Sequence, residues 1–201
     1  MVTPLGAGTV VGQTIRWNGT DWVAVLSFQE PVAESVDPAA ASSLAITGLL
    51  GDTDIVYLVV FKILKDSTSG GGQLRIRLNN DSTAAHYSWG TFEINSGGTG
   101  SDGSQSDTSI GTFRTGSSDY VHASDFAIGY FLVYAKSGTS RRLIGQMGAK
   151  IAVNNDMSEA SFAGDWTDTA ANLTEIDFVS TVGNIGGAGS FIRVFRLYKP
   201  V

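Results

Sequence analysis

The 201-residue chain contains no cysteine, and this absence excludes several kinds of chemistry at once. Disulfide bridges, cysteine-ligated zinc and thiol nucleophiles all require that side chain. A fold without disulfides is also not tied to an oxidising or a reducing compartment. We therefore expect a protein that is stabilised by packing alone and that carries no cofactor.

Basic residues are scarce as well. Lysine and arginine total 13 against 19 aspartates and glutamates, which gives a formal net charge of −6 at pH 7. Contacts to phosphates need clustered lysine or arginine. The only adjacent basic pair is Arg141-Arg142, which we interpret as part of a solvated hairpin turn. We therefore expect no nucleic-acid partner.

No apolar run reaches the length that a transmembrane helix needs, so we expect no membrane partner. The first residues also lack a basic segment followed by an apolar one, which is the pattern of a signal peptide. We therefore expect a protein that is made in the cytoplasm without a signal peptide.

Long stretches of helix-forming residues are missing too, whereas glycine is abundant at 25 residues. The central stretch is 55–64 (IVYLVVFKIL), which is apolar except for one lysine and rich in β-branched and aromatic types. Such a run, bounded by turn residues, predicts a strand that is buried on both faces. A buried helix is the alternative, but the β-branched content argues against it. We expect its partners to be 126–136 and 190–199.

Further short apolar or alternating runs predict more strands of the same kind. These strands are expected near 44–47, 73–78, 86–94, 109–114, 141–152 and 173–180. Within one of them, strict alternation predicts that Leu74, Ile76 and Leu78 point inward while Arg75 and Arg77 point outward. Residues 96–109 have almost no apolar side chains and are expected to form a long exposed loop. Strands at this spacing without helical crossovers predict an all-β fold, an antiparallel β-sandwich of the jelly-roll kind.

The chain divides into three parts on composition. Residues 1–28 are predicted to be an N-terminal docking arm, 29–43 a linker rich in proline and acidic residues, and 44–201 the sandwich. The arm contains Asn18-Gly19 between two alternating runs, which predicts a β-hairpin. Its large apolar residues need a partner surface, because an isolated hairpin is marginal in water; they are Ile15, Trp17, Trp22 and Val23. The alternative is that the hairpin folds back on its own main domain.

Residues that could carry catalysis or bind a metal are few. The two histidines, His86 and His122, are not accompanied by any hydrolase, P-loop or metalloprotease motif. Asp52 and Asp54, and the segment 79–81 (NND), could offer oxygens to calcium, but turn residues that bond their own backbone are the simpler interpretation. We therefore expect no catalytic site and no metal site.

Aromatic side chains suggest a contact with sugars. Tyr87, Trp89, Phe92 and Trp166 could form a stacking platform, although Trp89 and Phe92 cannot share one face of a regular strand. Packing in the core is the alternative for each of these rings.

Two groups of residues resemble proteins of tailed-bacteriophage particles. Residues 12–23 (GQTIRWNGTDWV) are similar to a G-Q-x-L-x-W-N-G-T-x-W-V element that recurs in phage tail fibres and other particle proteins. The main domain resembles a phage jelly-roll or lectin-like module at 46–54 (ITGLLGDTD), 78–81 (LNND) and 187–198 (GAGSFIRVFRLY).

The resemblance implies a structural virion protein without a catalytic residue. Our leading hypothesis is a capsid decoration, or cement, protein that binds the outside of the shell through its arm, works as a homotrimer and has the major capsid protein or another virion protein as partner. The alternative is a head or tail fibre module that binds a host surface glycan, with 96–109 and the aromatic strand as the contact region.

Overall fold

The computed structural model is built almost entirely of strands. It describes residues 13–17, 20, 22–26, 31–65, 73–95, 98–112, 125–150 and 157–198. The strands are β1 (Gln13–Trp17), β2 (Trp22–Leu26), β3 (Ala33–Val36), β4 (Ser43–Thr47), β5 (Val56–Leu64), β6 (Leu74–Leu78), β7 (Tyr87–Asn95), β8 (Gly98–Asp107), β9 (Ile110–Gly111), β10 (Phe126–Tyr134), β11 (Arg141–Lys150), β12 (Met157–Trp166), β13 (Glu175–Ser180) and β14 (Phe191–Tyr198). A single helical turn, α1 (Gly51–Asp54), precedes β5.

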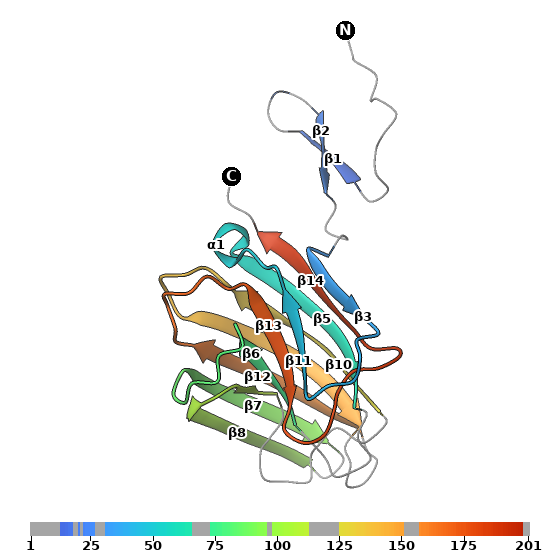
Figure 1. Ribbon diagram of the computed structural model, residues 1–201, viewed down its shortest axis with the longest axis vertical. Helices are drawn as coiled ribbons and strands as arrows, with labels where there is room; N and C mark the ends of the chain where they lie inside the picture. Colours follow the sequence, from blue (N-terminus) through green and yellow to red (C-terminus); the bar gives the residue numbers. More distant parts are fainter. Residues whose placement is uncertain are drawn as a thin grey trace.

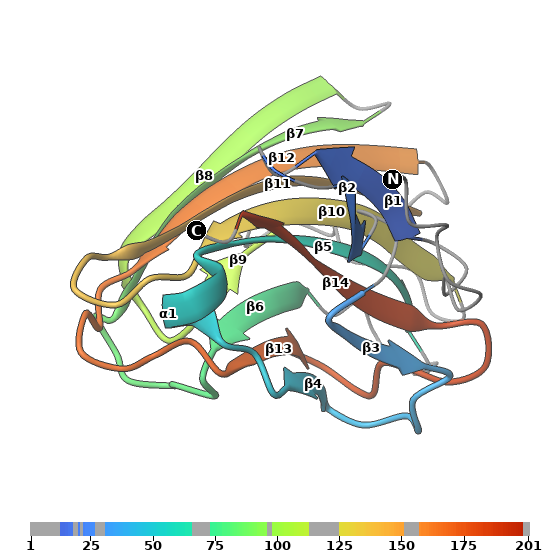
Figure 2. The same cartoon turned by 90° about the horizontal axis from the view of Figure 1, so that it is seen from above.

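Two antiparallel sheets face each other and form a sandwich. The large sheet has eight strands in the order β3-β14-β5-β10-β11-β12-β7-β8, and the small sheet has four in the order β4-β13-β6-β9. The chain passes repeatedly from one sheet to the other, and Figure 2 shows the two sheets as separate layers. The predicted antiparallel β-sandwich is confirmed.

The strand β5 lies near the middle of the large sheet, between its two expected partners. It pairs along its length with β10 on one side and with β14 on the other. Its residues alternate in burial: Tyr57, Val59, Phe61 and Ile63 are buried, whereas the intervening residues are only half-buried. The prediction that this strand is buried on both faces is therefore wrong, because the small sheet covers one face only.

The core lies between the sheets and is centred on four phenylalanine rings. Phe131 has the rings of Phe61, Phe162 and Phe178 within 6.0–6.4 Å of its own centroid. All four side chains are buried. The inward positions of β6 are also as expected, since Leu74, Ile76 and Leu78 are buried and alternate with half-buried arginines. Close aromatic packing of this kind contributes beyond the area that it removes from water.

Three strands were not expected from the sequence. The strand β3 lies inside the expected linker and pairs with β14, so part of 29–43 belongs to the sandwich. The region 96–109, expected as an exposed loop, contains β8, which pairs with β7 at the edge of the large sheet. The third, β12, lies between β11 and β7. Backbone hydrogen bonding makes β8 a strand although its side chains bury little.

The expected N-terminal hairpin is present as β1 and β2. The two strands pair with each other in a two-stranded sheet of their own, with Trp17 opposite Trp22. Figure 1 shows the pair beyond one end of the sandwich. The turn residues Asn18 and Gly19 lie outside the described residues.

Candidate functional site

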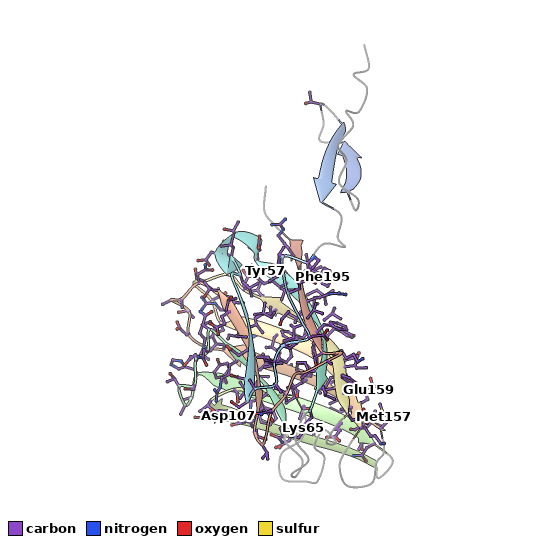
Figure 3. All side chains as sticks on the ribbon, turned by 45° about the vertical axis from the view of Figure 1, so that its right-hand side comes forward. Tyr57, Lys65, Asp107, Met157, Glu159 and Phe195 are labelled. Carbon is purple, nitrogen blue, oxygen red and sulfur yellow. The ribbon has the colours of Figure 1, made fainter. Side chains whose placement is uncertain are left out.

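The large sheet has two apolar faces, of which only one is covered by the small sheet. We call the uncovered one the outer face. Its exposed large residues are Phe92, Ile94, Ile128, Tyr130, Leu132, Tyr134, Ile144 and Met157. Half-buried Leu58, Val60 and Phe195 adjoin them on β5 and β14. Figure 3 shows Phe195 and Met157 along the same side of the sandwich. Contiguous apolar surface of this extent marks an interaction site in soluble proteins.

The outer face is hollowed by a groove of about 890 Å³. Its lining includes Leu58 and Val60 from β5, Ile128 and Tyr130 from β10, and Ile94 from β7. Between these larger side chains β11 contributes a glycine at position 148, which gives the groove its depth. The groove follows from the alternation of the strands, since every second residue of each strand points to this side.

Several charged groups on the outer face are paired within the chain. Arg142 lies 2.9 Å from Asp165, and Arg193 lies 3.3 Å from Glu34. These are exposed pairs, which contribute little to stability. Near the centre, the Tyr130 hydroxyl donates a hydrogen bond to the Gln146 side-chain oxygen at 2.8 Å. The middle of the face is thus apolar with a few neutral polar groups.

Three charged side chains on the outer face, Lys62, Lys150 and Glu159, have no ion-pair partner among the described residues. The Lys62 ammonium lies 3.9 Å from the centroid of the Phe126 ring. Glu159 is exposed on β12 at the edge of the groove, and Figure 3 shows it beside Met157. Lys62 and Glu159 belong to one row across the sheet, because Ile128 is opposite Lys62 and Gly148 is opposite both Ile128 and Glu159.

The aromatic residues proposed for glycan contact are mostly in the core. Tyr87, Trp89 and Trp166 are exposed by 0%, 7% and 1%, and their polar atoms are engaged inside the protein. The Trp89 indole donates to Asp107 at 3.0 Å, and the Trp166 indole donates to Asp81 at 2.7 Å. These three rings therefore form no exposed stacking platform. Phe92 is exposed on the opposite side of β7 from Trp89, as the alternation predicts.

The register of the hairpin separates the four residues proposed for docking. Trp17 is opposite Trp22, Ile15 is opposite Ala24, and Val23 is opposite Arg16. Residues directly opposite each other share one face of an antiparallel pair, and neighbours along a strand alternate. Ile15, Trp17 and Trp22 therefore occupy one face of the ribbon, and Val23 occupies the other. Docking through a single face can use only the first three.

Asp52 and Asp54, expected to bond their own backbone in a turn, instead contact other side chains and a distant segment of the chain. Asp54 accepts a hydrogen bond from the Tyr57 hydroxyl at 2.9 Å and contacts Arg196 at 3.2 Å. Asp52 accepts from the Ser137 backbone N–H at 2.6 Å. Among the described residues, no three histidine, aspartate or glutamate side chains converge as metal ligands would.

The histidine that the structure describes has a structural partner. His86 Nδ1 lies 2.6 Å from Asp81 Oδ2, and Asp81 also accepts from the Thr83 backbone N–H and the Trp166 indole. Burial alone would raise the pKa of Asp81, but these hydrogen bonds outweigh it and hold the pKa well below its ordinary value. The second histidine, His122, lies outside the described residues.

A buried acidic group on the small sheet was not recognised in the sequence. Asp177 is 3% exposed and accepts a hydrogen bond from the Asn80 backbone N–H at 2.9 Å. Burial, together with a hydrogen bond to Glu175 and repulsion from it, raises the pKa of Asp177 to about 7. A second, half-buried network joins Arg75 to Asp107 at 3.1 Å. Both bridge separate segments, so sequence spacing gives no indication of them.

The outer face was missed for a different reason. Runs such as 126–134 (FAIGYFLVY) are continuously apolar and were interpreted as strands between two layers. The indication that could have identified the face is β11, where Arg142, Gln146 and Lys150 are polar residues on one side of the strand.

No helix in the described part of the chain is both long and apolar enough to cross a bilayer. Comparisons of the chain with protein-family models, with curated proteins and with solved structures give no match. The class that fold and site define is accordingly a β-sandwich with a separate N-terminal hairpin and one uncovered apolar face. Function has to be inferred from those surfaces and from the sequence motif.

Proposed function

We propose that the chain is a structural virion protein that binds the outside of a bacteriophage capsid and cements neighbouring capsomers. The motif at 12–23 supports the virion assignment, and the uncovered apolar surfaces support attachment rather than catalysis. The observation that carries the proposal is the hairpin, which pairs only with itself and places Ile15, Trp17 and Trp22 on one face.

In this proposal the arm acts through apolar area and repetition. Each Å² that the hairpin removes from water contributes about 25 cal/mol, so a small ribbon gives a modest contact. Several copies around a symmetric shell convert modest contacts into high avidity. The sandwich then lies outside the shell as a body that needs no chemistry of its own.

Binding to particles that lack the protein tests the proposal. The full chain is mixed with such capsids, and co-sedimentation is compared with that of a variant carrying Trp17→Ser and Trp22→Ser. Val25→Ser is the matched control, because Val25 is opposite Thr14 on the other face of the hairpin. We expect the double variant to lose binding and the control to retain it, with unchanged melting temperatures. Binding that survives in the double variant contradicts attachment through this face.

A fibre module that binds a host glycan is the second candidate, and the groove favours it. Tyr130 and Gln146 present a ring and an amide side by side on the outer face, which are groups that contact sugars in binding modules. Specific glycan binding on an array that is lost in Tyr130→Ala would support this candidate against the cement hypothesis. A protein that binds capsids and no glycan supports the cement hypothesis.

A further inference from the structure

The two halves of the outer face differ in the size of their side chains. One half, formed by β14, β5 and β10, carries mostly large residues. The other half, formed by β11, β12 and β7, carries the large residues Phe92, Ile94, Ile144 and Met157, but between them it has small residues at Gly148, Ser161, Ala163 and Gly90. The boundary between β10 and β11 is the centre of the eight-stranded sheet, with four strands on each side. The face therefore has a ridge of large side chains on one half and, on the other half, a hollow at these four small residues between larger side chains.

We propose that the outer face binds the outer face of a second copy of this chain, around a two-fold axis parallel to the strands between β10 and β11. Such a rotation places β10 over β11 of the second copy, β5 over its β12, and β14 over its β7. A two-fold interface uses the same surface on both subunits, so the surface must complement itself. The ridge of each copy then enters the hollow of the other.

The strand registers show which residues would meet. Ile128 is opposite Gly148 within the chain, so the rotation exchanges them and seats Ile128 over the glycine of the second copy. In the same way Leu132 meets Ile144, and Tyr130 meets Gln146. Further from the axis, Leu58 of β5 comes over Ala163 of β12, because both align with the pair Leu132–Ile144. A large residue thus meets a small one at Ile128–Gly148 and at Leu58–Ala163, whereas Leu132 and Ile144 form an apolar contact between two large side chains.

Two of the three unpaired charges, Lys62 and Glu159, fit the same axis. Lys62 and Glu159 lie in one row, each one strand further from the boundary than Ile128 and Gly148. The rotation brings Lys62 over Glu159 of the second copy, and Glu159 over its Lys62. Facing sheets cross at about 30°, and the length of both side chains allows them to span the resulting offset. A two-fold axis that crosses the strands at Val60 would instead put Lys62 over Leu58 of the second copy. These two residues lie in β5 at equal distances on either side of Val60.

The extent of the face matches what a stable dimer needs. Eight large side chains are 38–68% exposed on it. At roughly 200 Å² for each, they present on the order of 800 Å², which is the area that one partner buries in a standard interface. The face also carries pairs of opposite charge in a chain whose net charge is −6, so two copies would meet where they repel each other least.

The inference is independent of the proposed function, since self-association and capsid binding are separate measurements. It replaces the homotrimer expected from the phage resemblance by a dimer, because the matching of ridge, hollow and charge is two-fold.

Sedimentation equilibrium of the full chain tests the dimer. We expect a particle of twice the chain mass of 21.1 kDa. Lys62→Glu and Glu159→Lys should each raise the dissociation constant at least about tenfold, because each leaves two like-charge contacts. The double variant exchanges the charges and should return the constant to within about threefold of the parent value. A monomeric or trimeric parent chain, or a double variant as weak as the single ones, overturns the proposal.

A substitution in the hollow provides a second test that does not depend on charge. A Cβ at Gly148 would meet nothing nearer than the Ser158 backbone oxygen at 3.7 Å, so the backbone has room for a side chain here, and Gly148→Leu directs that side chain into the groove. It fills the space that Ile128 of the second copy needs and should abolish the dimer while the melting curve of the monomer stays cooperative. Val182→Asp, at a 44% exposed position that follows β13, is the control and should remain dimeric. An unchanged dimer in Gly148→Leu contradicts the proposed axis.

Discussion

The two faces of the large sheet are made from the same strands and similar residues, yet only one of them is covered. On the inner face, Phe61 and Phe131 are fully buried against the small sheet. On the outer face, Ile128 and Ile144 are 55% and 60% exposed. Neighbouring residues of one strand, such as Ile144 and the glycine that follows it, thus lie in different environments.

The comparison teaches that apolar alternation identifies the strands but not the number of layers. The four strands of the small sheet cover the eight-stranded sheet on one side only. A soluble protein rarely exposes a large contiguous apolar patch without a binding partner for it. The outer face therefore has the residue composition of a buried surface. In our proposal, another molecule covers it.

The largest difference between the faces should appear when one large residue is removed from each. Phe131→Ala deletes a ring that contacts three other rings in the core, and we expect it to cost about 3–5 kcal/mol of unfolding free energy. Ile128→Ala, on the outer face of the same strand, should cost less than about 1 kcal/mol in the monomer. Urea denaturation at low protein concentration measures both. Equal losses would mean that the outer face is already packed within the subunit.

The small sheet covers the inner face, and its stability should depend on pH through Asp177. The pKa of this residue is raised from 3.8 to about 7, so the folded state favours the protonated form. Its contribution to stability is fully present below pH 3.8 and is lost as pH rises through 7. The shift corresponds to at most about 4 kcal/mol. Asp177→Asn keeps an acceptor for the Asn80 N–H and removes the titration.

We therefore expect the variant to gain stability relative to the parent chain as pH increases from 4 to 8. Urea denaturation of both proteins at each pH measures this difference. The carboxylates of Asp81 and Asp107, whose pKa values are lowered, act in the opposite direction but cancel in the comparison. A difference that stays constant with pH would show that Asp177 does not titrate in this range.

Much of the framework could be predicted from the sequence, because long apolar strands in the middle of a sheet are distinctive. The strand β5 and both its neighbours were located, as was the alternation of β6. The strand β8 could not be, since its glycines, serines and aspartates suit a loop equally well and only its pairing with β7 makes it a strand.

The candidate site was harder to predict than the fold. Hydrophobicity does not indicate which face of a sheet is covered by a second layer. Ile128 and Tyr130 could therefore not be distinguished from core residues. The same limit applied to Trp89, whose indole bonds Asp107 eighteen positions away in the chain. Contacts of this kind depend on tertiary structure, and residue types alone do not specify them.

The smallest effect expected concerns two glycines three positions apart on β11. A Cβ at Gly145, on the inner face, would lie 2.5 Å from Phe131 Cβ and 2.7 Å from the Phe162 ring, so Gly145→Ala should cost about 1–3 kcal/mol. Gly148 has space on the outer face, and Gly148→Ala should leave the monomer unchanged or stabilise it by about 0.5 kcal/mol. Urea denaturation of the two variants at low protein concentration compares them directly. A loss at Gly148 equal to that at Gly145 would show that the hollow is filled within one chain, which would remove the contrast between the two faces.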